Sequence, residues 1–200
     1  MADESETFKS NIKTVLADEH TRKVSFNAKG LQIRPEHFGI ISKLLTDGKM
    51  KAVIDPNIKK GRAAEYSADK NTIYGKEAGI EYNDQKATIV HECAHADLDC
   101  RGGEEQGFSV TNLINEMMGF LVAQSYQHSI NPRQMLMGTS DPNTVAFNVI
   151  KAKCGSTAFK DMTMPIDYSD AEVKPLLDCI EAHEEYRASA KLKSKTDGIK

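Results

Sequence analysis

The first half of the chain alternates short β-type segments with one amphipathic helical segment. Residues 22–28 alternate between polar and apolar side chains, and residues 34–48 place apolar side chains at helical spacing up to Gly48. Residues 49–57 predict a second short strand that ends at a proline and an asparagine, and residues 71–84 contain β-type side chains split by glycines, which fit one or two strands or a hairpin. These segments predict a small sheet.

Longer helical patterns dominate the second half of the chain. A helix is expected from about Asp84 to Asp99, followed by a glycine-containing loop. A helix over about 109–129, uncharged except for Glu116, should end before a proline. The remaining expected elements are a helix capped at Ser140 or Asp141 with Pro142 in its first turn and Gly155 after its end, an irregular connection over 155–168, and a charged helix from about Asp170 to Lys193.

These elements predict an α+β fold, mainly helical with a small sheet. Hydrophobic residues make up 40% and charged residues 28% of the chain, which is the balance of a globular protein. We expect a single domain over residues 1–200. Residues 1–20 are polar and should begin as a helix, and this segment and residues 194–200 are the parts expected to be flexible.

Charge and composition exclude several classes of partner. The net charge of -3 offers no field for nucleic acid or an anionic membrane, and no apolar run approaches the length of a membrane span. The N-terminus has acidic residues where a secretory signal is basic and apolar, so we expect a cytoplasmic protein or one exported by a route without an N-terminal signal. Four cysteines without a CxxC pair predict reduced, buried thiols. Composition leaves the oligomeric state open.

The sequence His91-Glu92-Cys93-Ala94-His95 carries the candidate chemistry. Histidines four residues apart on a helix lie about 40° apart and one turn up, so both imidazoles can bind one metal ion. Glu92 lies on the same arc, where its carboxylate could act as general base on a water at that ion. The other faces of this helix are apolar or small, which predicts burial with the polar face toward a cleft. The competing interpretation is a buried helix with two ordinary core histidines.

A hydrolytic zinc site needs a third protein ligand, and Glu116 is the main candidate. A carboxylate alone on an uncharged helix costs several kcal/mol to bury unless a cation or strong donors meet it. Glu104 and Glu105, in the glycine-rich segment, are rival third ligands, and a neutral or surface-exposed Glu116 is the alternative without a metal. Asp141 is better explained as a helix cap.

The segment from residue 87 to residue 124 resembles the thermolysin-like branch of the zincin metallopeptidases, the gluzincins. Their pattern is an HExxH helix, a connecting loop and a second helix with a ligand glutamate; this chain offers VHECAHADLD and then INEMMGFLVAQ. Asn115 and Glu116 stand where the family has an Asn-Glu pair, and Asp99 stands where it has an aspartate after the motif. The helix pair also looks like that of regulatory metallopeptidases that cleave repressors.

The resemblance implies a zincin-like domain in which the HExxH helix packs beside the second helix. It implies one zinc ion per chain with Glu92 as general base and with three ligands, namely His91, His95 and Glu116. The chain departs from the family at Phe120, where the pattern has an aspartate that hydrogen-bonds a ligand histidine. We expect Asp97, Asp99 or a backbone carbonyl to take that role.

Peptide hydrolysis also needs a donor to the developing oxyanion and a way to align the substrate. Candidate donors lie on the second helix and on the last helix: Tyr126, His128, His183 and Tyr186. In zincins an edge strand before the motif helix aligns the substrate by strand addition, and we expect residues 71–75 to form it.

The sequence therefore predicts a zinc-dependent metallopeptidase that acts on a protein or peptide substrate. Its compact size and the absence of a signal favour a dedicated enzyme with few targets, either an exported effector or a regulatory protease. A non-catalytic zinc-binding interaction module that retains the helix pair is the alternative, and a zinc hydrolase for a non-peptide amide is a third interpretation.

Overall fold

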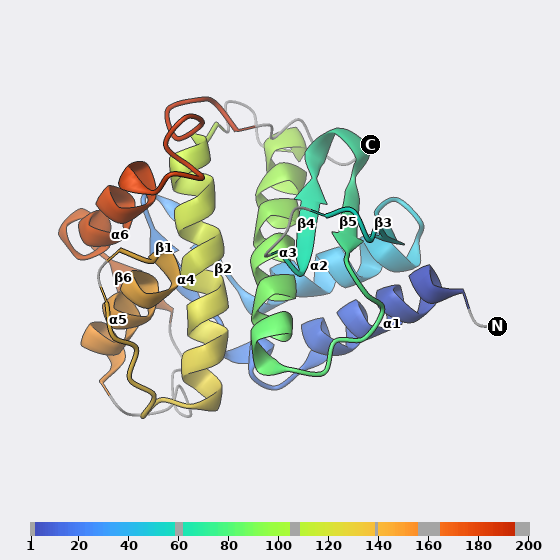
Figure 1. The fold of residues 1–200 in the computed structure, drawn as a ribbon, viewed down its shortest axis with the longest axis horizontal. Coiled ribbons are helices and arrows are strands. Elements are labelled where there is room, and N and C mark those ends of the chain that lie inside the picture. Colours follow the sequence, from blue (N-terminus) through green and yellow to red (C-terminus); the bar gives the residue numbers. More distant parts are fainter. Residues whose placement is uncertain (1–2, 59–61, 105–108, 139, 156–164, 195–200) are drawn as a thin grey trace.

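The computed structural model describes residues 3–58, 62–104, 109–138, 140–155 and 165–194 (Figure 1). The described residues form six helices and two three-stranded sheets, which confirms the predicted α+β class. Helices α3 (Asn83–Glu104) and α4 (Asn112–Ile130) run side by side through the middle of the molecule. No helix among the described residues is both long enough and apolar enough to cross a membrane.

One sheet joins the two ends of the chain. Strand β1 (Phe26–Ala28) pairs antiparallel with β2 (Leu31–Ile33) through the two-residue turn of Lys29 and Gly30, both of which have positive φ as a tight hairpin requires. Strand β6 (Ile166–Tyr168) pairs parallel with β1. It lies in the segment expected to be an irregular connection, of which residues 156–164 are outside the described residues.

The second sheet lies on the α3 side of the molecule. It has the order β3-β5-β4, with β3 (Lys51–Ile54) parallel and β4 (Ala64–Ser67) antiparallel to β5 (Thr72–Gly75). The prediction that residues 71–75 form an edge strand is therefore wrong. Strand β5 is paired on both sides, so β3 and β4 are the edge strands of this sheet. Of these two, β4 packs against α3.

The polar N-terminal segment, from residue 3 on, begins with a helix that packs against the core. Helix α1 (Glu4–Ala17) is capped by Asp3, whose side chain accepts from the Ser5 N–H. It buries Phe8 and Ile12 on one face and contacts β3. A short 3₁₀ turn (Thr21–Lys23) follows, and α2 (Pro35–Thr46) starts with a proline in its first turn and packs on α1 and α3.

Helices α5 (Pro142–Cys154) and α6 (Asp170–Ala182) cover the α4 side (Figure 1). The boundaries of α5 are as predicted, since Asp141 caps it and Gly155 follows it at φ 67°. Helix α3 extends through Gly102 and Gly103, about one turn beyond its predicted end. The second 3₁₀ turn of the chain (Ala68–Lys70) connects β4 to β5.

Helix α6 ends well before the predicted Lys193, for a tertiary reason. The backbone after it returns to the start of α4, where the N–H groups of Asn112 and Leu113 donate to the carbonyls of Leu192 and Ala190 at 2.8 and 3.1 Å. The first turn of any helix has N–H groups without partners in the helix, and this segment satisfies two of them. A continuous helix to residue 193 could not make these bonds.

Candidate metal centre

Helix α3 places the two motif histidines on one face, one turn apart. Their side chains are 12% and 11% exposed, and their rings meet edge to face with centroids 4.7 Å apart. The remaining faces of α3 are buried, as predicted, by its apolar or small residues, which are Ile89, Val90, Cys93, Ala94, Ala96 and Leu98. The helix is thus held by the core on most sides, and its polar arc opens toward α4.

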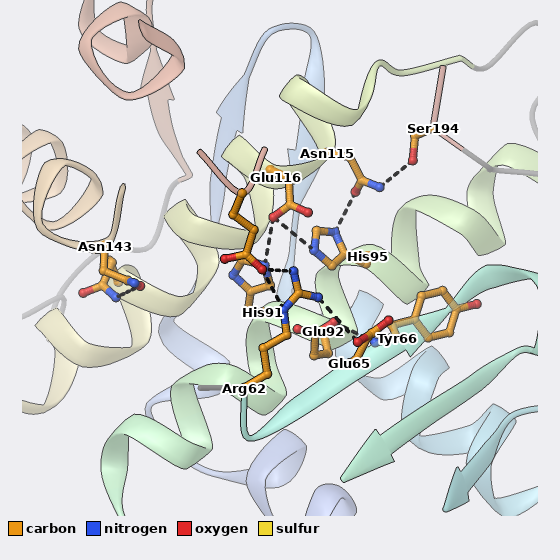
Figure 2. Close-up of polar contacts among 12 residues, drawn as sticks. Arg62, Glu65, Tyr66, His91, Glu92, His95, Asn115, Glu116, Asn143 and Ser194 are labelled. Atoms are coloured by element: carbon orange, nitrogen blue, oxygen red, sulfur yellow. Dashed lines mark hydrogen bonds and ion pairs between the residues drawn. The ribbon is translucent and has the colours of Figure 1, made fainter. Parts of the chain in front are cut away.

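Glu116, on the first half of α4, completes a cluster with the two histidines (Figure 2). Its Oε2 lies 3.5 Å from Nε2 of His91 and 3.8 Å from Nε2 of His95, and one ligand atom from each residue lies within 4.8 Å of the others. Zinc bonds of about 2.0–2.1 Å place tetrahedral ligand atoms about 3.4 Å apart. The three side chains therefore fit a metal ion with little movement. The rival ligands Glu104 and Glu105 have no described side chains, and Asp141 caps α5 by accepting from the Thr144 N–H.

Glu116 and the neighbouring Glu92 have opposite electrostatic environments. Burial by itself would raise the pKa of Glu116, but the nearby His95 and His91 outweigh it and lower this pKa to about 2. Burial dominates at Glu92, whose pKa rises to about 7 although His95 and the Tyr66 N–H oppose the shift. The Glu116 carboxylate is therefore charged at neutral pH, and Glu92 has the pKa of a group that exchanges protons near neutrality.

Asn115 orients the His95 ring, a role that was not predicted for it from the sequence. Oδ1 of Asn115 lies 2.8 Å from Nδ1 of His95, and Nδ2 of Asn115 donates to Oγ of Ser194 at 2.6 Å (Figure 2). An amide oxygen can only accept, so Nδ1 of His95 carries its proton and Nε2 presents its lone pair to the cluster.

The expected substitutes for the family's aspartate are engaged elsewhere. Asp97 is buried against His37 of α2 and accepts from Arg101 at 2.7 Å, and Asp99 accepts from the Tyr66 hydroxyl at 2.6 Å. Asp97 lies on a different arc of α3 from the histidines, whereas Asp99 lies one turn beyond His95 with its carboxylate bonded to β4. Asp97 and Asp99 therefore do not take the aspartate's role, and the hydrogen bond to His95 comes instead from Asn115.

Phe120 and Gly119 shape the space around His91. The Phe120 ring packs edge to face on the His91 ring at a centroid distance of 5.0 Å. Gly119 has no side chain where one would collide, since a Cβ there would lie 2.6 Å from Nε2 of His91. The aspartate of the family pattern is thus replaced by an aromatic contact that positions the ring without a hydrogen bond.

The cluster lies in the wall of a cavity of about 500 Å³. Strand β4 forms part of this wall, and the backbone N–H of Tyr66 donates to Oε2 of Glu92 at 2.8 Å. Because Lys76 N–H donates to the Ala63 carbonyl in the ladder, the alternation of an antiparallel pair turns the backbone groups of Ala64 and Tyr66 away from β5. The backbone groups of Ala64 therefore face away from the ladder beside the cluster, and the N–H of Tyr66 on the same side is the one bonded to Glu92.

Of the four expected oxyanion donors, only Tyr186 lines the cavity. Burial raises the pKa of its hydroxyl, with Glu116 and Glu185 adding to the shift. Tyr126 and His128 lie in the core on other faces of α4, where Tyr126 packs on His20 and His128 Nε2 lies 3.1 Å from the Gly155 carbonyl. His183 ends α6 and is not part of the cavity lining. The sequence pattern of α4 shows no periodic signal that separates these faces, because the helix is buried almost all round.

A cation near the cluster was not foreseen from the sequence. Arg62, just before β4, lines the cavity, and its Nε donates to Oε1 of Glu185 at 3.0 Å while Nη1 lies 3.5 Å from Glu65 (Figure 2). Burial tends to lower the pKa of Arg62, but the hydrogen bond and the charge of Glu185 raise it. The pair joins residues 123 positions apart, so no local pattern could reveal it.

Comparison with known proteins identifies no relative. No family model matches the chain, and neither a curated protein nor a solved structure matches it. The cluster and its cavity are therefore the basis for assigning a function.

Proposed function

We propose that this protein is a zinc-dependent metallopeptidase of the zincin type. His91, His95 and Glu116 would hold the zinc ion, and Glu92 would be the general base. The observation that carries the proposal is the convergence of three ligand atoms within 4.8 Å in the wall of a cavity. A metal site with three protein ligands leaves a position for water or substrate, which is the arrangement of catalytic rather than structural zinc.

A bound zinc ion supplies Lewis acidity, which polarises a carbonyl and lowers the pKa of water to about 7. Glu92 would take a proton from the attacking water and deliver it to the leaving amine. Its Oε2 accepts from the Tyr66 N–H, so Oε1 would be the oxygen that accepts the proton. The Asn115 bond orients His95 for ligation.

The cavity wall also supports a peptide as the substrate. An extended peptide could pair with the outward backbone groups of Ala64 on the edge of β4, which would align its backbone beside Glu92. The Tyr186 hydroxyl is the candidate donor to the oxyanion, because it lines the same cavity and packs on Phe120 at 5.8 Å between centroids.

The decisive experiment combines metal content with a single substitution. We expect about one zinc per chain by elemental mass spectrometry after purification without added metal or chelator, and cleavage of peptides from a mixed library. Glu92→Gln should retain the zinc and lose at least about 10²-fold in rate. The control is Glu81→Gln, an exposed glutamate ahead of α3, which should retain both zinc and activity.

Two outcomes would refute the proposal. Peptide hydrolysis by zinc-loaded Glu92→Gln protein would show that Glu92 is not the general base. Zinc binding without cleavage by the unmodified protein would favour the non-catalytic zinc-binding module, which the replacement of the family's aspartate by Phe120 makes a real alternative.

A further inference from the structure

The cavity extends beyond the metal cluster along the second half of α4. Phe120, Gln124 and Gln127 follow Glu116 at intervals of three or four residues, so they share the face that carries the ligand. Because α3 and α4 run antiparallel, the opposite wall is the start of α3, where Thr88 and Asp84 line the cavity. The result is a cleft between two helices that leads away from Glu92.

Four side-chain carboxamides line this extension, and we call them the amide subsite: Gln124, Gln127, Gln134 and Asn143. Gln134 belongs to the segment between α4 and α5, where Gln134 and Leu136 are half-buried and the alternate Met135 and Met137 are 75% and 88% exposed. Lys151 anchors this segment by donating to the Gln134 carbonyl at 2.9 Å. The alternation turns Gln134 into the cavity.

A hydrogen bond within the subsite determines what it can bind. Nε2 of Gln124 donates to Oδ1 of Asn143 at 2.9 Å, and Gln124 is 6% exposed, so its orientation is set by this bond. Two carboxamides joined once in this way present one carbonyl oxygen, from Gln124, and one NH₂ group, from Asn143, to a third group. A third carboxamide has the complementary acceptor and donor. An alkyl group has neither, and a carboxylate has no proton to donate.

We infer that the amide subsite binds a glutamine or asparagine side chain of the peptide substrate near the scissile bond. This inference rests on the proposed peptidase function. Gln124 lies eight residues from Glu116, about 12 Å along the helix, so the longer glutamine suits the distance better than asparagine. The exposed carboxylate of Asp84, on the facing wall, disfavours glutamate at the same place. The enzyme would thus prefer glutamine-containing substrates.

Binding to zinc-loaded Glu92→Gln protein tests the inference without turnover. The probes are peptides identical except at one position, which is scanned through the sequence and holds glutamine, glutamate or leucine. At one position we expect glutamine to bind about tenfold more tightly than either alternative, because those alternatives leave the carbonyl of Gln124 unpaired. Gln124→Leu and, separately, the exposed Asn143→Leu should bring the three affinities within about twofold. Asn148→Leu, an exposed asparagine on α5 outside the cavity, is the matched control and should preserve the preference.

Three results would overturn the inference: no position at which glutamine is preferred, a preference that survives both subsite substitutions, or an equal loss for every peptide in the Gln124→Leu protein. The last would mean that Gln124 contacts the substrate backbone instead. The same peptides incubated with the unmodified protein test the proposed function separately. A glutamine preference in binding without cleavage would refute the peptidase and leave the subsite standing.

Discussion

Gly119 shows how a single residue limits the geometry of the cluster. It lies between Met118 and Phe120 on the face of α4 that meets His91, and the His91 ring occupies the volume of an absent side chain. Gly119 has ordinary helical backbone angles. A glycine is needed here because it leaves space for the His91 ring. The close approach of the two helices at Glu116 depends on this position.

We predict that Gly119→Ala weakens zinc binding about tenfold or more. The added Cβ would lie 2.6 Å from Nε2 of His91, so the ring must move away from Glu116. Competition with a chromogenic chelator measures the affinity. Gly39→Ala on α2 is the control, since a Cβ there would have no neighbouring atom within 4 Å; it should leave the affinity unchanged and stabilise the protein by up to about 1 kcal/mol. Equal zinc affinity in Gly119→Ala and the unmodified protein would contradict this account.

Among the elements, the segment that follows α6 supports the site from a distant part of the sequence. It satisfies N–H groups at the start of α4, places Tyr186 at the cavity, and brings Ser194 to Asn115. Ser194 is 6% exposed and its own N–H donates to the Val110 carbonyl at 2.8 Å. A segment remote from the motif in sequence therefore supports the orientation of His95.

We predict that Ser194→Ala lowers zinc affinity about tenfold, because Asn115 loses the acceptor that fixes its amide and with it the orientation of His95. Ser194→Thr, which keeps a hydroxyl, should restore most of the affinity. Ser189→Ala is the control on the same segment, since the Ser189 hydroxyl donates to the Tyr186 carbonyl and does not contact Asn115. Zinc titration of the three variants, with urea unfolding of the metal-free proteins, separates orientation from stability. The same loss of affinity in Ser189→Ala would show that the segment matters only for folding.

For the whole molecule, α3 and α4 form the boundary between two halves. Helices α1 and α2 and the second sheet pack on the α3 side, and α5 and α6 pack on the α4 side. The three candidate ligands come from both central helices, so a bound ion links the halves. Its binding energy should therefore appear in the stability of the fold.

We predict that chelation lowers the melting temperature. A ligand at 100 times its Kd stabilises the folded state by about 2.7 kcal/mol, and about 2–4 °C accompanies each kcal/mol in a chain of this length. The expected shift is thus roughly 5–10 °C by differential scanning calorimetry. Glu92→Gln should show the same shift, because Glu92 is not a ligand in this scheme, and Glu116→Gln should show little of it. A full shift in Glu116→Gln would exclude Glu116 as a ligand.

The sequence by itself determined the features that depend on neighbours along the chain. The caps of α5 follow from Asp141, Pro142 and Gly155, which act within one turn. The polar arc and buried faces of α3 follow from the helical period, and so does the proximity of His91 to His95. The isolated charge of Glu116 on an apolar helix was enough to indicate a cluster with the histidines, because an unpaired buried carboxylate is costly.

Only the tertiary structure decided which partners those elements meet. The early end of α6, the edge position of β4, the bond from Asn115 to His95 and the carboxamide pair of the amide subsite all join residues far apart in sequence or on different elements. Helix α4 is buried on nearly every side, so its hydrophobic pattern could not distinguish the cavity face from the core faces of Tyr126 and His128. Local periodicity specifies a helix and its face, whereas the packing of the other elements determines what that face contacts.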